Sequence, residues 1–418
     1  MWRRGQGAWA AVCALAMLTA VSCTDTTTTT TITSQSTVTV PATKTSTASQ
    51  PAAFTPVVGS VVAEPVPVPA TDGKTHLAYE VQLSNMLGQE VTLNSVDVVS
   101  GDRTLLSLTG EQLSYWTRVV GNGGAPTDQI GPGQSALVWI DIAIDLSTGA
   151  QTPTKLTHRV SISVATPAPP LLPPTLSESV APTKVAQRSP IAIAPPLDGA
   201  NWLDGNSCCA MTAHRMAVNP LNGGLWAAER FAVDYVQLQP DGKLFNGDRE
   251  NLASYAYYGA AVHAVSDGPV IAVVDDQPDQ VPGKDPTGLT LQQYGGNYIV
   301  QDLGGGNYAF YAHLKPGSIR VKVGDALTAD QTIAQLGNSG NSSAPHLHFH
   351  VMSSPDPLVS DGLPFVFTGF RLVNRLASAA EVDRLEAGEP AVMQPAFQPS
   401  EHTDVSPLVL DVMTYGQS

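Results

Sequence analysis

Residues 346–351 read His-Leu-His-Phe-His-Val, a strict alternation of imidazole and apolar side chains. Because successive side chains of a β-strand point to opposite faces, this period of two predicts a strand. His346 and His348 would then line a groove, while the apolar residues between them face a core. Neutral imidazole is a preferred ligand of zinc, so the pattern predicts a zinc site. The alternative is a strand of hydrogen-bonded core histidines.

Similar alternation elsewhere predicts a chain built mostly of β-strands. Runs of this kind occupy 77–83, 91–96 and 135–142, with turn-forming residues between them. Their length and spacing are typical of an immunoglobulin-like β-sandwich, which we place at 55–165 and which carries no chemical motif. A second group of strands fills 201–375.

Two hairpins and one long loop are expected in this second group. Residues 298–303 and 308–314 flank three glycines, and 262–274 contains Asp267-Gly268, so both segments predict β-hairpins. The stretch 275–296, rich in Asp, Pro and Gly, is long enough to be functional and could form one wall of a substrate groove.

Composition limits the class of partner. The chain has 418 residues, of which only 14% are charged, and its net charge is −15. The length suggests two or three domains, and the acidic charge argues against an electrostatically driven nucleic-acid partner, so we expect no nucleic acid.

The N-terminus resembles an export signal. Residues 1–23 combine the basic pair Arg3-Arg4, an apolar stretch over 8–21 and a final Ser22-Cys23. A small residue before a cysteine at this place is typical of a lipoprotein signal, in which Cys23 becomes the lipidated end, and ordinary cleavage is the alternative. We therefore expect an extracytoplasmic protein of the cell envelope. Thr24 favours an outer-membrane address over retention at the inner membrane.

Three segments are expected to lie outside folded domains. Residues 24–54 are rich in Thr and Ser and predict a flexible linker, and 166–200 is a Pro-rich linker. Residues 376–418 read as a C-terminal tail with a short helix over 377–389. The adjacent Cys208 and Cys209 are open to three interpretations: a vicinal disulfide, two small buried residues or a soft metal site.

Three segments of the second group resemble the lysostaphin-like zinc metallopeptidases of family M23. Residues 308–318 match the family's Tyr-Ala-His-Leu motif, 323–341 match the stretch that follows it, and 345–349 match its final Pro-His-Leu-His-Phe. The resemblance covers roughly 210 to 370 and implies an antiparallel β-sheet domain. It departs at His350, where the family has an acid, and we expect His350 to support the site or to lie at its rim rather than to bind metal.

The resemblance also implies roles for single residues. His348 would be a zinc ligand, and Asp234 matches a ligand of the family's early His-x-Gly-x-Asp motif. His313 and His346 would flank the attacking water as general base and as stabiliser of the oxyanion, in an order that spacing does not decide. Arg230 stands where the motif has its first histidine, and a guanidinium cannot bind zinc.

Two interpretations of this departure stay open. In the first, Arg230 pairs with Asp234 and the fold has no active metal. In the second, which we favour, His214 replaces the missing ligand, and Arg230 orients Asp234 or binds a substrate carboxylate. A hairpin with a three-residue loop at 222–224 would set His214 opposite Ala232 on the face of Asp234, whereas a two-residue loop would spoil that alignment.

The sequence therefore predicts a zinc metalloendopeptidase that cleaves the peptide cross-links of bacterial peptidoglycan by means of a zinc-activated water. The predicted metal ligands are His214, Asp234 and His348, and the predicted catalytic residues are His313 and His346. The alternative is a catalytically degenerate M23 domain that binds the wall or activates another hydrolase.

Overall fold

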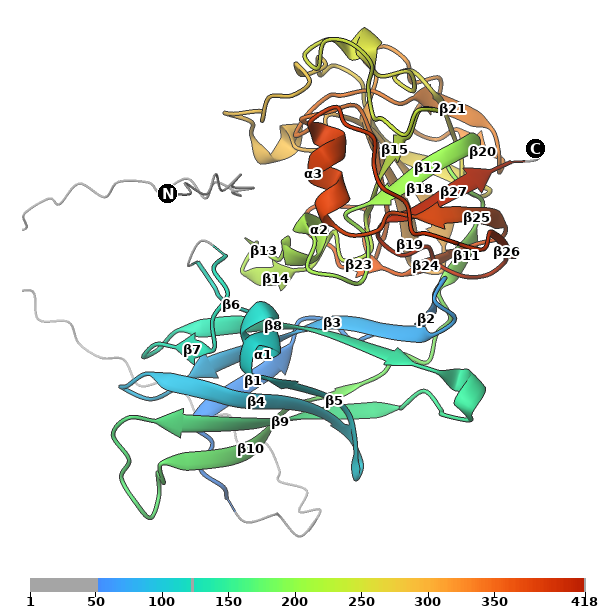
Figure 1. Ribbon diagram of the computed structural model, residues 1–418. Coiled ribbons are helices and arrows are strands. Elements are labelled where there is room, and N and C mark those ends of the chain that lie inside the picture. Colours follow the sequence, from blue (N-terminus) through green and yellow to red (C-terminus); the bar gives the residue numbers. More distant parts are fainter. Residues whose placement is uncertain (1–51, 122–123, 417–418) are drawn as a thin grey trace, which may run out of the picture. The chain divides into compact units, whose positions relative to one another are not determined.

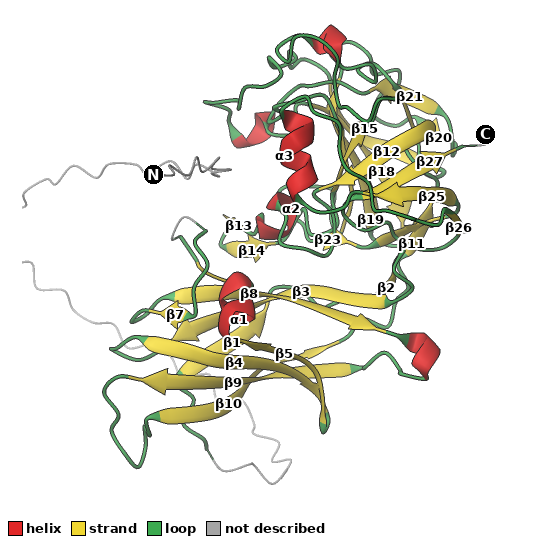
Figure 2. Ribbon diagram, in the orientation of Figure 1, coloured by secondary structure: helices red, strands yellow, loops and turns green. Residues whose placement is uncertain are grey.

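The computed structural model describes residues 52–121 and 124–416. The predicted signal over 1–23, with Cys23, and nearly all of the 24–54 linker lie outside these residues. Strands dominate (Figure 2), which confirms the prediction of a mostly β, antiparallel protein. Among the described residues no helix has the length and apolar character needed to cross a membrane. The described residues from 56 onward belong to one compact unit.

The first group of strands forms a β-sandwich of two antiparallel sheets around one apolar core (Figure 1). The expected linker 166–200 was wrong in part, because residues 175–184 pair with 155–164 and extend the second sheet. The first sheet contains β1 (Val57–Val61), β2 (Val68–Pro69), β3 (Thr75–Asn85), β8 (Ser135–Ile144) and β6 (Thr117–Val119). The second contains β10 (Thr175–Lys184), β9 (Lys155–Val164), β4 (Val91–Ser100), β5 (Arg103–Thr109) and β7 (Gln129–Ile130). Helix α1 (Gly110–Tyr115) follows β5.

Strand β3 is buried on both of its faces. Tyr79 and Val81 lie in the sandwich core, whereas Ala78 packs in a separate cluster with Phe231 and Val366 of the second group. A strand with two covered faces is unusual in an antiparallel sandwich, whose outer faces commonly meet water. The outer face of this sheet is therefore a packing surface for the second group of strands.

The second group is organised around one large antiparallel sheet of 11 strands among the described residues. Leu347, Phe349 and Val351 point into its core, as the alternation predicts. In order, the sheet contains β20 (Ala326–Leu327), β17 (Gly268–Val274), β18 (Asn297–Gly304), β19 (Asn307–Leu314), β22 (Leu347–Met352), β15 (Val233–Gln237), β12 (Gly199–Gly205), β27 (Asp411–Tyr415), β25 (Phe370–Arg375) and β26 (Ser400–His402), with β23 (Gly362–Leu363) beside β22.

Three pairs of short strands and two further helices complete this group. The pairs are β11 (Ile191–Ile193) with β24 (Phe365–Phe367), β13 (Asn219–Leu221) with β14 (Gly224–Trp226), and β16 (Ala261–His263) with β21 (Thr332–Gln335). The helices are α2 (Ala213–Met216) and α3 (Ala380–Glu386). The short helix expected over 377–389 is confirmed.

Two expectations about pairing fail, and one succeeds. The hairpin predicted over 262–274 is wrong, because β16 pairs with β21 while β17 pairs with β18 and β20. The tail predicted over 376–418 is also wrong, because β26 and β27 join the large sheet. Both errors concern partners that are distant in sequence. The hairpin of β18 and β19 around the three glycines, whose strands are neighbours in sequence, is confirmed.

The pair Cys208 and Cys209 forms a vicinal disulfide, the first of the three interpretations. Both residues are buried in the cluster that joins the two groups of strands.

Candidate metal centre

Register across three strands builds the floor of the site. On β15, β22 and β19, Asp234 lies opposite His348, and His348 lies opposite Ala312. Directly opposed residues share one face of a sheet, so Asp234 and His348 point the same way. The small Ala312 leaves room above the third strand. The Nδ1 atom of His348 lies 3.0 Å from Oδ1 of Asp234.

His214 reaches the same carboxylate from a helix and not from a hairpin strand. It lies on α2, and its Nε2 is 3.2 Å from Oδ2 of Asp234. The predicted hairpin exists but has the two-residue loop, with Leu221 opposite Gly224. The register argument for His214 was therefore wrong, although the residue is where the argument required it. The side chain of Thr212 caps α2 by accepting a hydrogen bond from the backbone N–H of Arg215 at 3.2 Å.

His346 and His313 complete the cluster. His346 directly precedes β22, and its Nε2 lies 3.3 Å from Oδ1 of Asp234. The ring centroids of His313 and His346 are 4.7 Å apart. In a regular strand His313 would point away from the face that Ala312 shares with His348, but its φ of +58° is left-handed and re-aims the side chain. Such backbone strain is typical of functional sites.

Backbone carbonyls fix the tautomers of these imidazoles. The Nδ1 atoms of His214, His313 and His346 lie 2.8 to 3.0 Å from the carbonyl oxygens of Ala232, Ser339 and Ala344. A carbonyl can only accept, so each Nδ1 carries a proton, and in the neutral imidazole each Nε2 presents a lone pair. This arrangement is the usual way in which proteins orient metal-binding histidines.

The donor set fits a zinc ion. One donor atom each from His214, Asp234 and His348 lie within 4.8 Å of one another, and the same holds for His313, His346 and His348. Two imidazoles and one carboxylate are a common protein ligand set of catalytic zinc, with a further position left for water. The structure thus brings together all five residues that the sequence predicted for the site.

Electrostatics couple these groups strongly. Burial opposes ionisation of Asp234, but the imidazoles of His214 and His346 hold the pKa of Asp234 well below its usual range. Burial lowers the pKa of His214, whereas Asp234 raises it, and the net result is a pKa of about 9. Burial, with help from His346 and His348, pushes the pKa of His313 well below its usual range. The positive charge of protonated His214 therefore compensates the negative charge of Asp234, a role that a bound cation would also fill.

His350 lies behind His348, at the place where the resemblance expects an acid. Its Nδ1 is 2.9 Å from Nε2 of His348, and it is only 1% exposed. Nε2 of His348 can donate a hydrogen bond to this nitrogen of His350. The other ring nitrogen of His348, Nδ1, is the one that faces Asp234. His350 is thus a buried partner of His348 and does not lie at a rim.

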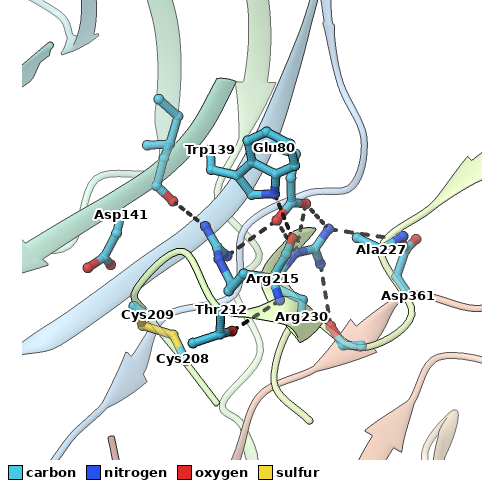
Figure 3. Close-up of polar contacts among 12 residues, drawn as sticks. Glu80, Trp139, Asp141, Cys208, Cys209, Thr212, Arg215, Ala227, Arg230 and Asp361 are labelled. Carbon is cyan, nitrogen blue, oxygen red and sulfur yellow. Dashed lines mark hydrogen bonds and ion pairs between the residues drawn. A yellow bond between two sulfur atoms is a disulfide. The ribbon is translucent and has the colours of Figure 1, made fainter. Parts of the chain in front are cut away.

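Arg230 has no contact with Asp234, which excludes the Arg230–Asp234 pair of the first interpretation. Its guanidinium binds Glu80 of β3, with Nε 2.9 Å and 3.1 Å from the two carboxylate oxygens (Figure 3). Arg230 is 3% exposed and Glu80 is fully buried. Arg230 therefore neither orients Asp234 nor faces a substrate.

Sequence reasoning missed the residues around Arg230. Glu80 sits in an alternating run and reads as a solvent-facing position of the sandwich. Arg215 follows His214 without any motif of its own, and Trp139 reads as one of several buried strand residues. Only the packing of β3 and β8 against the second group brings them together.

A family model matches part of the second group of strands. Residues 252–359 match the model described as Peptidase family M23, a region that includes His313, His346 and His348 but not His214 or Asp234. The β-sheet domain is therefore a peptidase domain. It belongs to peptidase family M23.

Among known proteins, the chain is similar to the glycyl-glycine endopeptidase ALE-1 of Staphylococcus capitis. The two are 31% identical over 122 residues, which is 29% of this chain and 29% of that protein. Among solved structures, it is similar to the catalytic domain of lysostaphin from Staphylococcus simulans, at 23% identity and a TM-score of 0.21 over 40% of this chain and 88% of that one. A zinc-containing peptidase from Vibrio cholerae matches at 17% identity and a TM-score of 0.24, over 69% of this chain and 82% of that one.

Proposed function

We propose that this protein is a zinc-dependent endopeptidase that cleaves peptide cross-links of bacterial peptidoglycan. One observation carries the proposal: the Asp234 carboxylate is contacted by His214, His346 and His348, and His313 lies beside His346. A hydrogen-bond partner behind each ring fixes its orientation. Burying that many polar rings is costly unless each has a partner. The similarity to a glycyl-glycine endopeptidase favours a peptide substrate of this type.

In this proposal His214, Asp234 and His348 hold the metal, and His313 and His346 act on the substrate. A bound zinc ion would supply Lewis acidity, which makes water a better nucleophile and polarises the scissile carbonyl. The Nε2 atoms of His313 and His346 can each accept a proton from the attacking water and, once protonated, donate a hydrogen bond to the oxygen that gains charge. Their carbonyl partners, Ser339 and Ala344, keep both rings aimed at the reacting atoms.

The loop over 275–296 is proposed to form a wall of the substrate groove. It runs beside the loop that leads to His346, since Asn338 N–H donates to Asp279 at 2.8 Å and Gly283 N–H donates to the Ser343 carbonyl at 2.7 Å. The backbone N–H of His313 donates to the carbonyl of Gly295 at 3.0 Å. The loop is thus joined to the segments that carry both proposed catalytic histidines.

Export and anchoring are part of the same proposal. The basic and apolar pattern of 1–23 and the Ser22-Cys23 pair support a lipoprotein of the cell envelope, attached through Cys23 at the outer membrane. The Thr- and Ser-rich stretch that follows would let an anchored enzyme reach the wall. Labelling of growing cells with a fatty-acid analogue tests this, because Cys23→Ala should abolish the label.

One observation favours a second function, a degenerate domain that binds the wall or activates another hydrolase. Arg230 occupies the place of the family's first histidine and is used in a buried ion pair instead. If His214 does not replace that ligand, the domain binds no zinc. Binding to peptidoglycan without cleavage would then be the remaining activity.

The deciding experiment measures zinc content and cleavage together. The purified protein should carry one zinc ion per chain and clear a peptidoglycan suspension, and His214→Ala should lose both properties. His263→Ala is the matched control, because His263 pairs with Asp198 and takes no part in the centre. A wild-type protein that binds no zinc and leaves peptidoglycan intact refutes the enzyme. Sedimentation of that protein with peptidoglycan would support the second function.

A further inference from the structure

A buried ionic cluster joins the β-sandwich to the segment that carries His214 (Figure 3). Glu80 of β3 lies between two guanidinium groups, those of Arg215 on α2 and of Arg230. All three residues are 3% exposed or less. One carboxylate thus serves two buried cations. Asp361, whose Oδ1 is 3.9 Å from Nη2 of Arg230, supplies further negative charge.

The sandwich holds α2 at three points. Nη1 of Arg215 lies 3.2 Å from Oε1 of Glu80, and Nη2 of Arg215 donates to the carbonyl of Ile140 at 3.2 Å. The indole N–H of Trp139 donates to the backbone carbonyl of Arg215 at 2.6 Å. These contacts bind both the side chain and the backbone of one residue of α2.

Such anchoring matters because α2 is too short to be stable alone. It has four residues, whereas isolated helices shorter than about 12 residues are marginal in water. Its own domain contributes the Thr212 cap and the bond from His214 Nδ1 to the carbonyl of Ala232. The remaining polar anchors of Arg215 come from β3 and β8 of the sandwich.

We propose that the β-sandwich is a positioning module of the metal centre. Glu80 and Trp139 hold Arg215, which is the next residue after His214 in the chain. A shift of one helical turn at this point would carry Nε2 of His214 away from Asp234, from which it now lies 3.2 Å. This inference rests on the proposed function, since it concerns the ligand that replaces the family's first histidine.

The proposal also gives a reason for the arginine in the early motif. Arg230 shares Glu80 with Arg215. Position 230, where the resemblance expects a metal ligand, is therefore part of the ionic cluster that holds His214 in place. In this proposal, the arginine at 230 and the use of His214 as the substitute ligand depend on the same cluster.

Trp139→Phe is the sharpest test, because it removes one hydrogen bond to α2 while keeping an aromatic ring in place. Trp202→Phe is the control: Trp202 is equally buried and donates to the backbone carbonyl of Asp198 at 2.8 Å, away from α2. Zinc affinity of the whole protein is measured by competition with a chromophoric chelator. Loss of a group bonded to a metal ligand typically weakens binding about 10- to 100-fold. Trp139 acts one residue further away, through Arg215, so we expect a loss near the lower limit, about 10-fold, for Trp139→Phe and no change for Trp202→Phe.

Hydrogen exchange in the metal-free protein provides a readout independent of zinc. The amides of residues 212–217 should exchange faster in Trp139→Phe and in Glu80→Gln than in the wild type. Their exchange rates should be unchanged in Trp202→Phe. If the wild type binds zinc while Trp139→Phe binds it within about twofold and exchange over 212–217 is unaltered, the positioning role is wrong and the proposed function stands. If the wild type binds no zinc, both fail together.

Discussion

The substitution Arg230→His restores the residue type that the M23 resemblance places at this position. The structure predicts that it destabilises the protein and adds no zinc ligand. Arg230 lies in the turn before β15, and its guanidinium contacts both oxygens of Glu80 from a site that is 3% exposed. An imidazole at 230 would extend toward Glu80 and not toward Asp234. Glu80 would then keep only Arg215, whose Nη1 is 3.2 Å away without hydrogen-bond geometry.

The magnitude follows from burial. Removing one partner of a buried ion pair costs about 3–5 kcal/mol, because the other charge stays buried and poorly compensated. Arg215 still offsets part of the charge of Glu80, so we expect a loss near the lower limit, about 3 kcal/mol in the free energy of unfolding. Urea unfolding followed by tryptophan fluorescence and by circular dichroism measures this loss and tests whether the transitions coincide.

A surface arginine provides the control for this measurement. Arg159 makes a similar pair with Asp97, with Nη2 at 3.0 Å, but its side chain is 49% exposed. Exposed pairs contribute about 0–1 kcal/mol, so Arg159→His should have little effect. An Arg230→His protein as stable as Arg159→His, or one that binds zinc more tightly than the wild type, would refute the placement of Arg230 in a buried ion pair with Glu80.

Three further predictions concern other parts of the chain. His350→Ala should weaken zinc binding about 10- to 100-fold in the chelator competition, and His350→Glu should retain it, because either an imidazole or a carboxylate can accept from Nε2 of His348. Burial raises the pKa of Glu178 to about 7, and the N–H of Val57 partly offsets this rise. The neutral carboxyl therefore stabilises the fold fully below about pH 4.5, and this stabilisation is lost as the pH rises through 7. Glu178→Gln should therefore raise the free energy of unfolding by up to about 3 kcal/mol at pH 8 and leave it unchanged at pH 4, and equal effects at both pH values would contradict this. Gly340→Ala should abolish peptidoglycan clearing, because a Cβ there would meet the backbone of Gly296 beside the site, whereas Gly369→Ala, with open space around it, should be active.

The sequence by itself determined the features that depend on local backbone geometry. The alternation over 346–351 was enough to place His348 and the core residues on opposite faces, because side-chain direction in a strand follows from its pleat. Three glycines between two alternating runs were enough for the hairpin of β18 and β19. The M23 motifs lie in these same segments, so family membership and most of the candidate site were readable.

Tertiary structure alone decided how the remaining site residues arrive. His214 reaches Asp234 from α2, and no period or turn signal encodes that approach. His313 enters the site through a left-handed φ that alternation contradicts. Glu80 reads as a surface residue, yet it is fully buried because the outer face of β3 meets another part of the chain. In each case the outcome depends on which distant surface covers the residue, and the free energy that fixes such a contact comes from packing between segments and not from either segment alone.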